Sequence, residues 1–314
     1  MKKNGMIPGI WFEFETVGED SIAFSYVDHL LKKDGFPLTI GKRRFWDMND
    51  PWVIDYLEKK IIDFLQKYVF GYLKIDYNET IGIGADGAES YGEKLRQQLA
   101  GTQTFIQKIK NRLPDLIIES CSSGGHRLEP SMMSLSDLSS FSDAHEADSI
   151  PIIAANLHHL LLPRQSLIWA VLRENDSQQR LYYSLISTFL GRMCLSGDIE
   201  KLSDVQWKIV DQAIQFYKSI VPIIKYGITE RLGNLPLSYQ RMSGHQILKR
   251  QREEKLLVVI HFFDEMEVFV PTSFQTIVAS FGLEDQKMSL KRTEKGFFIV
   301  SPYQMTACAL LLKK

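Results

Sequence analysis

Short apolar runs alternate with longer segments of helical periodicity from the start of the chain to about Tyr226. The apolar runs predict buried strands, because they are short and are bounded by polar or turn residues. These predicted strands are Met6–Phe14, Tyr72–Asp76, Leu116–Cys121, Leu138–Asp143, Ser166–Leu172 and Arg192–Leu195. The predicted helices between them are Pro51–Tyr68, Gly92–Arg112, Ile150–Leu161 and Ser177–Leu190. Repeated strand–helix units indicate a parallel sheet.

A further helix is predicted from Ser203 to about Val221. Ser203 and Gln206 have the spacing of a capping box, and the apolar positions that follow keep a helical period. Acidic residues stand at the ends of most predicted strands, which favours a barrel over a doubly wound sheet. A closed barrel needs eight strands, so the six predicted here give an incomplete (β/α)8 TIM-type barrel over residues 1–226.

The pattern changes from about Gly227, where short β runs are separated by turn residues. These runs are Ile247–Lys249, Leu256–Phe263, Glu267–Val270, Thr276–Val278, Phe297–Val300 and Thr306–Leu312. They predict a small antiparallel β-sandwich domain over residues 227–314, without catalytic residues. The charged segment Arg241–Lys255 predicts a solvated hairpin face.

The composition changes this picture little. A net charge of −1 gives no footprint for nucleic acid or an anionic membrane, and no apolar stretch is long enough for a membrane span. Cys121, Cys194 and Cys308 show no zinc or pairing pattern, so we expect reduced thiols, no metal and a cytoplasmic protein. His158 and His159 lie among leucines, which is more typical of structural histidines than of metal ligands.

The segment Lys74–Asn78 is the sharpest candidate for chemistry. Residues two apart on a strand share a face, so Lys74, Asp76 and Asn78 project together. An ammonium beside a carboxylate favours the ionised form that a nucleophile requires. Paired carboxylates at a barrel mouth are what glycosidic cleavage needs. A buried Lys–Asp pair that only holds the barrel mouth explains the same pattern, and both interpretations stay open on this evidence.

Several motifs together resemble glycoside hydrolase family 36, the retaining α-galactosidases. KIDYN is followed by ESCSSGGHR and then by SFSD, in the order and spacing of that family. PGIWFEFE resembles its third barrel strand, RRFWDMNDPWVIDYL the segment that leads into the next helix, and GRMCLSGDIEKLS its eighth strand. The resemblance covers about residues 5–225 and implies strands 3 to 8 of the barrel.

The resemblance also implies roles for individual residues. Asp76 takes the position of the nucleophile and Asp143 that of the acid/base, with their carboxyl groups roughly 5–5.5 Å apart. The residues that it assigns to the galactose pocket are Trp11, Lys74, Asn78, Cys121, Gly124 and Arg127. The implied substrates are raffinose-type and melibiose-type α-galactosides, and neither a metal nor an organic cofactor is needed.

Departures from the family pattern indicate a divergent and N-terminally truncated member. His126 replaces a glycine, Ser140 an aromatic residue, and Gly41 an arginine, with Arg43 and Arg44 nearby. No DDGW-like segment of the first two strands is found. We therefore expect the chain alone to be inactive or nearly so, unless a homo-oligomer or a complementing chain completes the barrel. The alternatives are a non-catalytic carbohydrate-binding remnant and a transgalactosylase.

Overall fold

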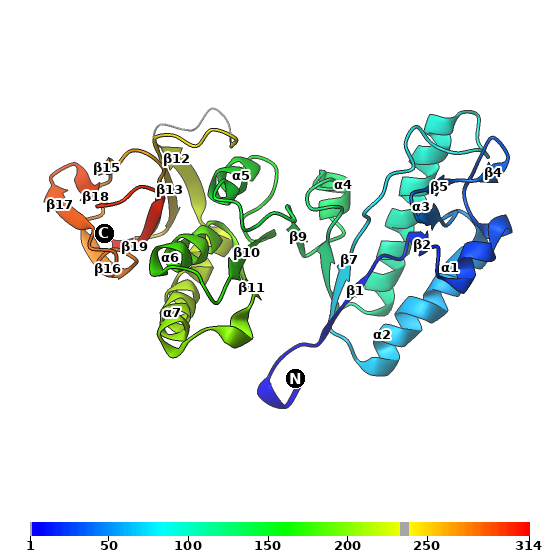
Figure 1. Ribbon diagram of the computed structural model, residues 1–314, viewed down its shortest axis with the longest axis horizontal. Coiled ribbons are helices and arrows are strands. Elements are labelled where there is room, and N and C mark those ends of the chain that lie inside the picture. The colour runs from blue at the N-terminus through cyan, green and yellow to red at the C-terminus, as the bar shows by residue number, and fades with distance from the viewer. Residues whose placement is uncertain (1, 233–238) are drawn as a thin grey trace. The chain divides into compact units, whose positions relative to one another are not determined.

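The chain, seen in a computed structural model, forms two compact units, Met1–Asp143 and Ala144–Lys314 (Figure 1). The structure describes residues 2–232 and 239–314. The division between domains at residues 226 and 227 stays a prediction. None of the helices in the described residues has the length and apolar character of a membrane-spanning helix.

Four parallel strands form the central sheet of the first unit. Their order is β1 (Gly9–Phe12), β7 (Tyr72–Ile75), β8 (Ile117–Ser120) and β9 (Leu138–Ser140). Trp11 lies opposite Lys74 in this register, and Lys74 lies opposite Glu119. The parallel arrangement brings the carboxyl ends of the strands, and the polar residues that follow them, to one edge of the sheet.

Helices pack against this sheet and form the core of the unit with it. They are α1 (Pro51–Leu57), α2 (Asp63–Tyr68), α3 (Tyr91–Arg112) and α4 (Pro130–Met133). Asp50 caps α1 by accepting from the Trp52 N–H, and Pro51 occupies the first turn, where its missing N–H does no harm. A π-helical turn, η4 (Glu58–Ile62), joins α1 to α2, so the helix predicted over Pro51–Tyr68 is continuous but locally unwound.

The segment between β1 and α1 folds into short elements that the sequence pattern did not predict. Its strands are β2 (Thr16–Gly18), β3 (Lys32–Lys33), β4 (Phe36–Pro37), β5 (Thr39–Ile40) and β6 (Arg43–Phe45). Short helical turns are η1 (Lys2–Asn4), η2 (Ile22–Ser25) and η3 (Val27–His29). β2, β6 and β5 form an antiparallel sheet. Strands of two or three residues are too short to show a period of two.

The second unit begins with helices and two parallel strands. Its helices are α5 (Ile150–Leu157), α6 (Gln178–Ser187), η5 (Thr188–Leu190), η6 (Ile199–Lys201) and α7 (Asp204–Tyr226). β10 (Ser166–Leu172) pairs in parallel with β11 (Arg192–Gly197). The capping box predicted at Ser203 and Gln206 is confirmed at the start of α7.

Two antiparallel sheets complete the second unit. The larger has the order β12 (Ile228–Leu232), β13 (His245–Arg252), β14 (Lys255–Phe262), β19 (Thr306–Lys313) and β16 (Thr276–Phe281). The smaller has the order β15 (Glu267–Pro271), β18 (Gly296–Val300) and β17 (Ser289–Thr293). Ile247, Val258 and Leu310 share one apolar core with Val270 and Ile299 of the smaller sheet.

The opposite face of the larger sheet is buried against helices and carries polar side chains among apolar ones such as Leu248 and Val259. Arg250, Gln246 and His261 are each 0% exposed, and Arg250 donates to the carbonyl of Leu190 in η5 at 3.0 Å. The prediction of a solvated hairpin is therefore wrong at Arg250. Alternation along β13 turns its side chain toward the helices, while Glu253 and Lys255 at the hairpin tip are exposed.

The predicted fold class is confirmed. The first unit carries four parallel strands and the second two, each group with its own helices, and antiparallel sheets follow at the C-terminus. Within the residues that the structure describes, this is an incomplete (β/α)8 barrel with a C-terminal β region.

Candidate active site

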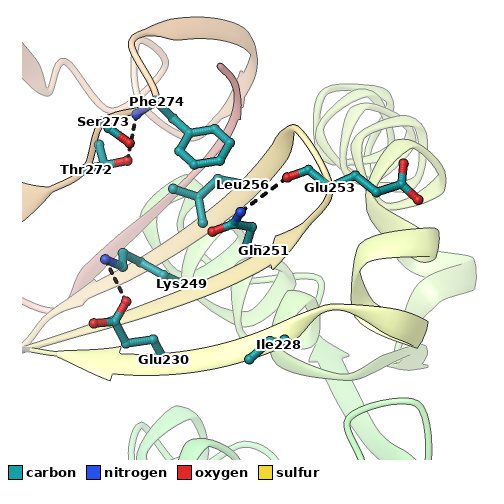
Figure 2. Close-up of a pocket in the computed structure, with 9 residues that line it drawn as sticks. All are labelled: Ile228, Glu230, Lys249, Gln251, Glu253, Leu256, Thr272, Ser273 and Phe274. Atoms are coloured by element: carbon teal, nitrogen blue, oxygen red, sulfur yellow. Dashed lines mark hydrogen bonds and ion pairs between the residues drawn. The ribbon is translucent and has the colours of Figure 1, made fainter.

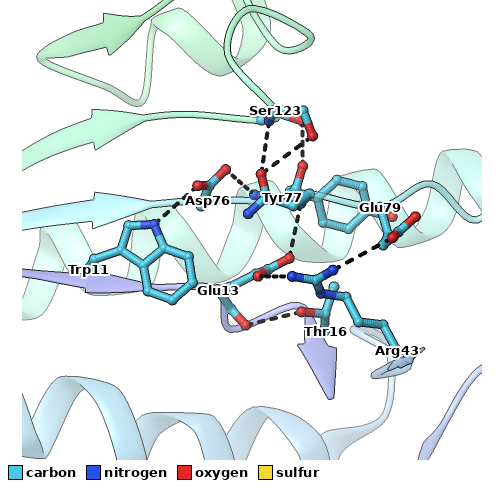
Figure 3. Close-up of polar contacts among 10 residues, drawn as sticks. Trp11, Glu13, Thr16, Arg43, Asp76, Tyr77, Glu79 and Ser123 are labelled. Atoms are coloured by element: carbon cyan, nitrogen blue, oxygen red, sulfur yellow. Dashed lines mark hydrogen bonds and ion pairs between the residues drawn. The ribbon is translucent and has the colours of Figure 1, made fainter. Parts of the chain in front are cut away.

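Asp76 directly follows β7 and lies 8% exposed at the carboxyl edge of the first unit's sheet. Its backbone N–H donates to the Phe12 carbonyl at 2.9 Å, which continues the β1–β7 ladder by one residue. The Trp11 indole N–H donates to Oδ2 at 3.1 Å and the Tyr77 N–H to Oδ1 at 2.8 Å (Figure 3). Neighbouring strands thus fix the orientation of the carboxylate.

These hydrogen bonds set the charge state of Asp76. Burial alone raises the pKa of the carboxyl, but hydrogen bonds from Trp11, Asn78, the Tyr77 N–H and Cys121 outweigh it and lower the pKa below its ordinary value. We expected the ammonium of Lys74 to have this effect. Lys74 instead forms an ion pair with Glu119 at 3.3 Å, and Glu119 also accepts a hydrogen bond from the Tyr72 hydroxyl.

Asn78 connects three segments of the site. Its backbone N–H donates to Glu13 Oε1 at 3.0 Å, and its side-chain oxygen accepts from the Ser123 N–H at 3.3 Å. The other oxygen of Glu13 accepts from Arg43 at 3.1 Å, and Arg43 also lies 3.6 Å from Glu79 (Figure 3). Glu13 therefore holds the backbone two residues after Asp76.

The loop after β8 carries Cys121 and Gly124. Cys121 is 3% exposed, and burial raises the pKa of its thiol to about 12, so the thiol is neutral and donates to Asp76. Gly124 has φ +82°, and a Cβ atom there would lie only 2.8 Å from Ser142 Cα. Only glycine allows this close approach of two backbones.

Asp143 follows Ser142 and is exposed, three residues beyond the end of β9. A Cβ at Gly124 would lie 3.2 Å from the Asp143 backbone nitrogen. Contacts thus run from Asp76 through Asn78, Ser123 and Gly124 to the residue next to Asp143. The structure brings the two predicted catalytic residues into one loop cluster, but it does not test their roles.

Arg127 is positioned by a buried acid. Its guanidinium donates to both oxygens of Glu15, at 2.6 and 3.0 Å, and lies 4.0 Å from the centre of the Tyr77 ring. Thr102 of α3 donates to the same carboxylate at 2.8 Å. Glu15 is 1% exposed. The role of Arg127 in sugar binding stays a prediction, since its guanidinium is engaged by Glu15.

Two residues of this cluster were missed by sequence reasoning. Arg43 was noted only as a neighbour of Gly41, and Ser123 only as part of the motif ESCSSGGHR. The φ of +43° at Ser123 is unusual for a residue other than glycine. No local pattern in the sequence signals that conformation.

Two of the grooves in the described residues contain both members of an ion pair. One, of about 520 Å³, lies between Tyr77, Arg127 and α3 in the first unit. The other, of about 400 Å³, lies in the second unit between β12, β13 and residues 272–274. Figure 2 shows that Lys249 and Glu230 project into this second groove from neighbouring strands, where they form an ion pair of 2.7 Å.

No group of three or more His, Cys, Asp or Glu side chains in residues 2–232 and 239–314 is arranged to hold a metal ion. The hydrogen bonds around Asp76 lower the pKa of its carboxyl and so favour its ionised form.

Comparison with known proteins identifies relatives of the whole first part of the chain. The family model described as Melibiase matches residues 1–227. Over 244 residues the chain is 26% identical to alpha-galactosidase AgaA of Geobacillus stearothermophilus, which covers 73% of this chain and 32% of AgaA. It is 30% identical over 132 residues to the alpha-galactosidase of Escherichia coli, which covers 41% of this chain and 18% of that protein.

Solved structures share the fold. A crystal structure of a GH36 alpha-galactosidase AgaA variant from Geobacillus stearothermophilus in complex with raffinose matches with a TM-score of 0.80 at 19% identity, covering 99% of this chain and 45% of that chain. The galactosidase domain of AgaSK matches with a TM-score of 0.78 at 18% identity, covering 99% and 44%. The chain thus spans less than half the length of these relatives. Because the Melibiase model matches most of its residues, the protein belongs to the Melibiase family and is a GH36 α-galactosidase-like protein.

Proposed function

We propose that this chain carries the catalytic residues of a retaining hydrolase for terminal α-galactosides, with Asp76 as nucleophile and Asp143 as acid/base. The relatives are named alpha-galactosidases, and structures of AgaA hold raffinose and stachyose. The observation that carries the proposal is the carboxylate of Asp76, which is buried at a strand end and kept ionised by four hydrogen-bond donors.

The proposed reaction has two steps. Asp76 attacks the anomeric carbon, while the protonated Asp143 donates to the departing glycosidic oxygen, so that a covalent galactosyl-aspartate forms. Asp143 then removes a proton from water, which attacks the same carbon and releases galactose with its configuration retained. The exposure of Asp143 suits a residue that exchanges protons with water, whereas the buried Asp76 suits a fixed nucleophile.

The surrounding residues fit a sugar pocket. Trp11 is 49% exposed while its indole N–H is bound to Asp76, so its ring offers a flat apolar wall beside the reacting carbon. Lys74 lies on β7 two residues before Asp76, the Asn78 side chain hydrogen-bonds to Asp76, and Cys121 and Gly124 belong to the adjacent loop. We place Arg127 behind this pocket, where its pair with Glu15 supports the Tyr77 side of the segment.

We infer that the edge of β1 that does not pair with β7 affects the activity of the chain. In the described residues β1 pairs only with β7, so the backbone groups along its other edge are open to further pairing. We propose that strands from the same or another polypeptide complete the barrel there, and that efficient hydrolysis depends on them. Co-expression of such strands should raise solubility and α-galactosidase activity together, whereas efficient hydrolysis by a monomer of these 314 residues would contradict this dependence.

The nucleophile is tested in a preparation that hydrolyses an aryl α-galactoside. Asp76→Ala should abolish turnover, because the covalent route loses its only partner. Added azide should restore part of the rate and give a product of inverted configuration. Asp137→Asn serves as the control, since Asp137 is bound to the Ile118 N–H outside the cluster. Wild-type rates for Asp76→Ala would show that another residue attacks.

The acid/base is tested by the leaving group. Asp143→Ala should slow substrates with poor leaving groups by about 10²–10⁴-fold, and activated aryl galactosides far less, because only the former need protonation. Equal losses for both substrates would move this role to another residue. Product analysis with an added sugar acceptor separates hydrolysis from transgalactosylation.

The three free cysteines fit a reducing compartment, so we also propose a cytoplasmic location.

A further inference from the structure

Basic side chains meet in the second unit between the helix-covered face of the larger sheet and the helices. Arg250 is 0% exposed and uses two of its nitrogens, donating to Thr229 Oγ1 at 2.9 Å and to the Leu190 carbonyl at 3.0 Å. Its third nitrogen, Nη1, is buried without a hydrogen-bond partner. Both acceptors are neutral, so the positive charge of the guanidinium is not compensated by its hydrogen bonds.

Two more basic groups lie beside Arg250. Arg231 is its diagonal neighbour on β12, a relation in which Cα atoms lie roughly 7–8 Å apart. Arg231 donates to Asn156 and to Gln246, and its buried Nε has no partner. His158, after α5, lies close enough to feel the charges of both arginines, and its buried ring also lies against the Leu190 carbonyl that accepts from Arg250.

No acid offsets this cluster. Among residues 2–232 and 239–314, no carboxylate forms an ion pair with Arg250 or Arg231. Residues 233–238 contain neither Asp nor Glu. Burial lowers the pKa of Arg250 to about 10, so the group still carries its charge at neutral pH. An unpaired buried charge is strongly destabilising, and buried donors in native proteins nearly always have partners.

We propose that this cluster binds a small monovalent anion, of the size of chloride or bromide, held by Arg250 Nη1 and the neighbouring Nε–H of Arg231. One negative charge neutralises the one fully buried guanidinium, and a spherical ion accepts hydrogen bonds from several directions. The ion would lock α5 and η5 onto β12 and β13, a structural role separate from hydrolysis.

The test is the thermal stability of the full chain in halide-free buffer, with chloride added at constant ionic strength against sodium gluconate. The melting temperature should rise by roughly 3–5 °C for each tenfold increase in chloride above its dissociation constant. Arg250→Met should abolish this dependence. Arg252→Met is the matched control, because Arg252 lies two residues along the same strand, is 35% exposed and pairs with Glu253. It should keep the full chloride response.

A flat wild-type response, or a response that persists in Arg250→Met, would overturn the proposal. If Arg250→Met does not fold, crystals of the wild type soaked in bromide decide the question. An anomalous peak within hydrogen-bond distance of Arg250 Nη1 supports the site. Bromide found only on the surface, or a water molecule at Nη1, overturns it.

Discussion

Arginine is buried in both compact units, but in opposite electrostatic surroundings. In the first unit, Arg127 donates to both oxygens of Glu15, and Thr102 and Tyr77 complete the environment of the pair. In the second unit, Arg250 is more deeply buried and finds only a hydroxyl and a carbonyl. Two buried arginines can therefore be neutralised in different ways. The charge of Arg127 is neutralised by Glu15 of the same chain, whereas we infer that the charge of Arg250 is neutralised by an anion from solution.

The largest effect is expected from Arg127→Met. Removal of the guanidinium leaves the carboxylate of Glu15 buried and unpaired, which destabilises the first unit by about 3–5 kcal/mol. Chemical denaturation followed by circular dichroism measures this loss. The double variant Glu15→Leu with Arg127→Met should recover most of it, because no charge is then left behind. Equal losses of unfolding free energy in the single and double variants would show that the destabilisation comes from lost packing and not from an unpaired charge.

A smaller effect is expected from acid, and only in the second unit. Burial lowers the pKa of His261 and of His158 to about 3, whereas an unfolded histidine titrates near 6.5. Between these values the unfolded chain binds one more proton per histidine, so stability is full above about pH 6.5 and falls as pH decreases toward 3. From pH 7 to 5.5 the two histidines together should cost roughly 2–3 kcal/mol.

Hydrogen exchange resolves this loss by region. Amides of β13 and β14 should lose protection on acidification before those of β7 and β8. His261→Leu should remove about half of the pH dependence of the second unit. Acidification that weakens both units equally would contradict the comparison between them.

The smallest of these effects is expected from Thr102→Val. This change removes one hydrogen bond to the charged carboxylate of Glu15 but leaves its ion pair with Arg127 intact, so it should cost about 1.5 kcal/mol, the low end for a hydrogen bond to a charged group. The nearly equal size of valine keeps the packing of α3. A loss as large as that of Arg127→Met would mean that Thr102, and not Arg127, is the main partner of Glu15.

Sequence patterns predicted the parts of the fold that depend on local order. Alternating apolar runs gave every parallel strand, and the cap at Ser203 marked the start of α7. The short strands of residues 16–45 were not predicted, because they are too short to show an alternating pattern and are held by contacts with other strands. β2 and β6 are an example, because Thr16 lies opposite Phe45, a residue far away in the sequence.

The candidate site shows the same limit. The position of Asp76 at a strand end could be read from Lys74–Asn78, because alternation fixes which side chains share a face. The partners of these side chains could not be predicted from the sequence. Glu15 and Arg127 are separated by 112 residues, and Lys74 forms its ion pair with Glu119 on the neighbouring strand β8. The prediction that Arg250 lies on a solvated hairpin face was wrong for a related reason. A charged segment looks solvated in sequence, whereas burial of its alternate residues is decided by helices elsewhere in the chain.

The π turn η4 determines which side chains of its helix face the core. The buried residues Val53, Leu57, Ile61 and Leu65 follow each other at intervals of four. In an α-helix each such interval overshoots a full turn by about 40°, so the stripe would drift by about 120° from first to last. One additional residue in the turn takes back about 100° of this drift. Deletion of the exposed Lys59 should therefore leave a regular helix with the same four side chains inward, whereas a one-residue deletion early in α3 would rotate Thr102 away from Glu15.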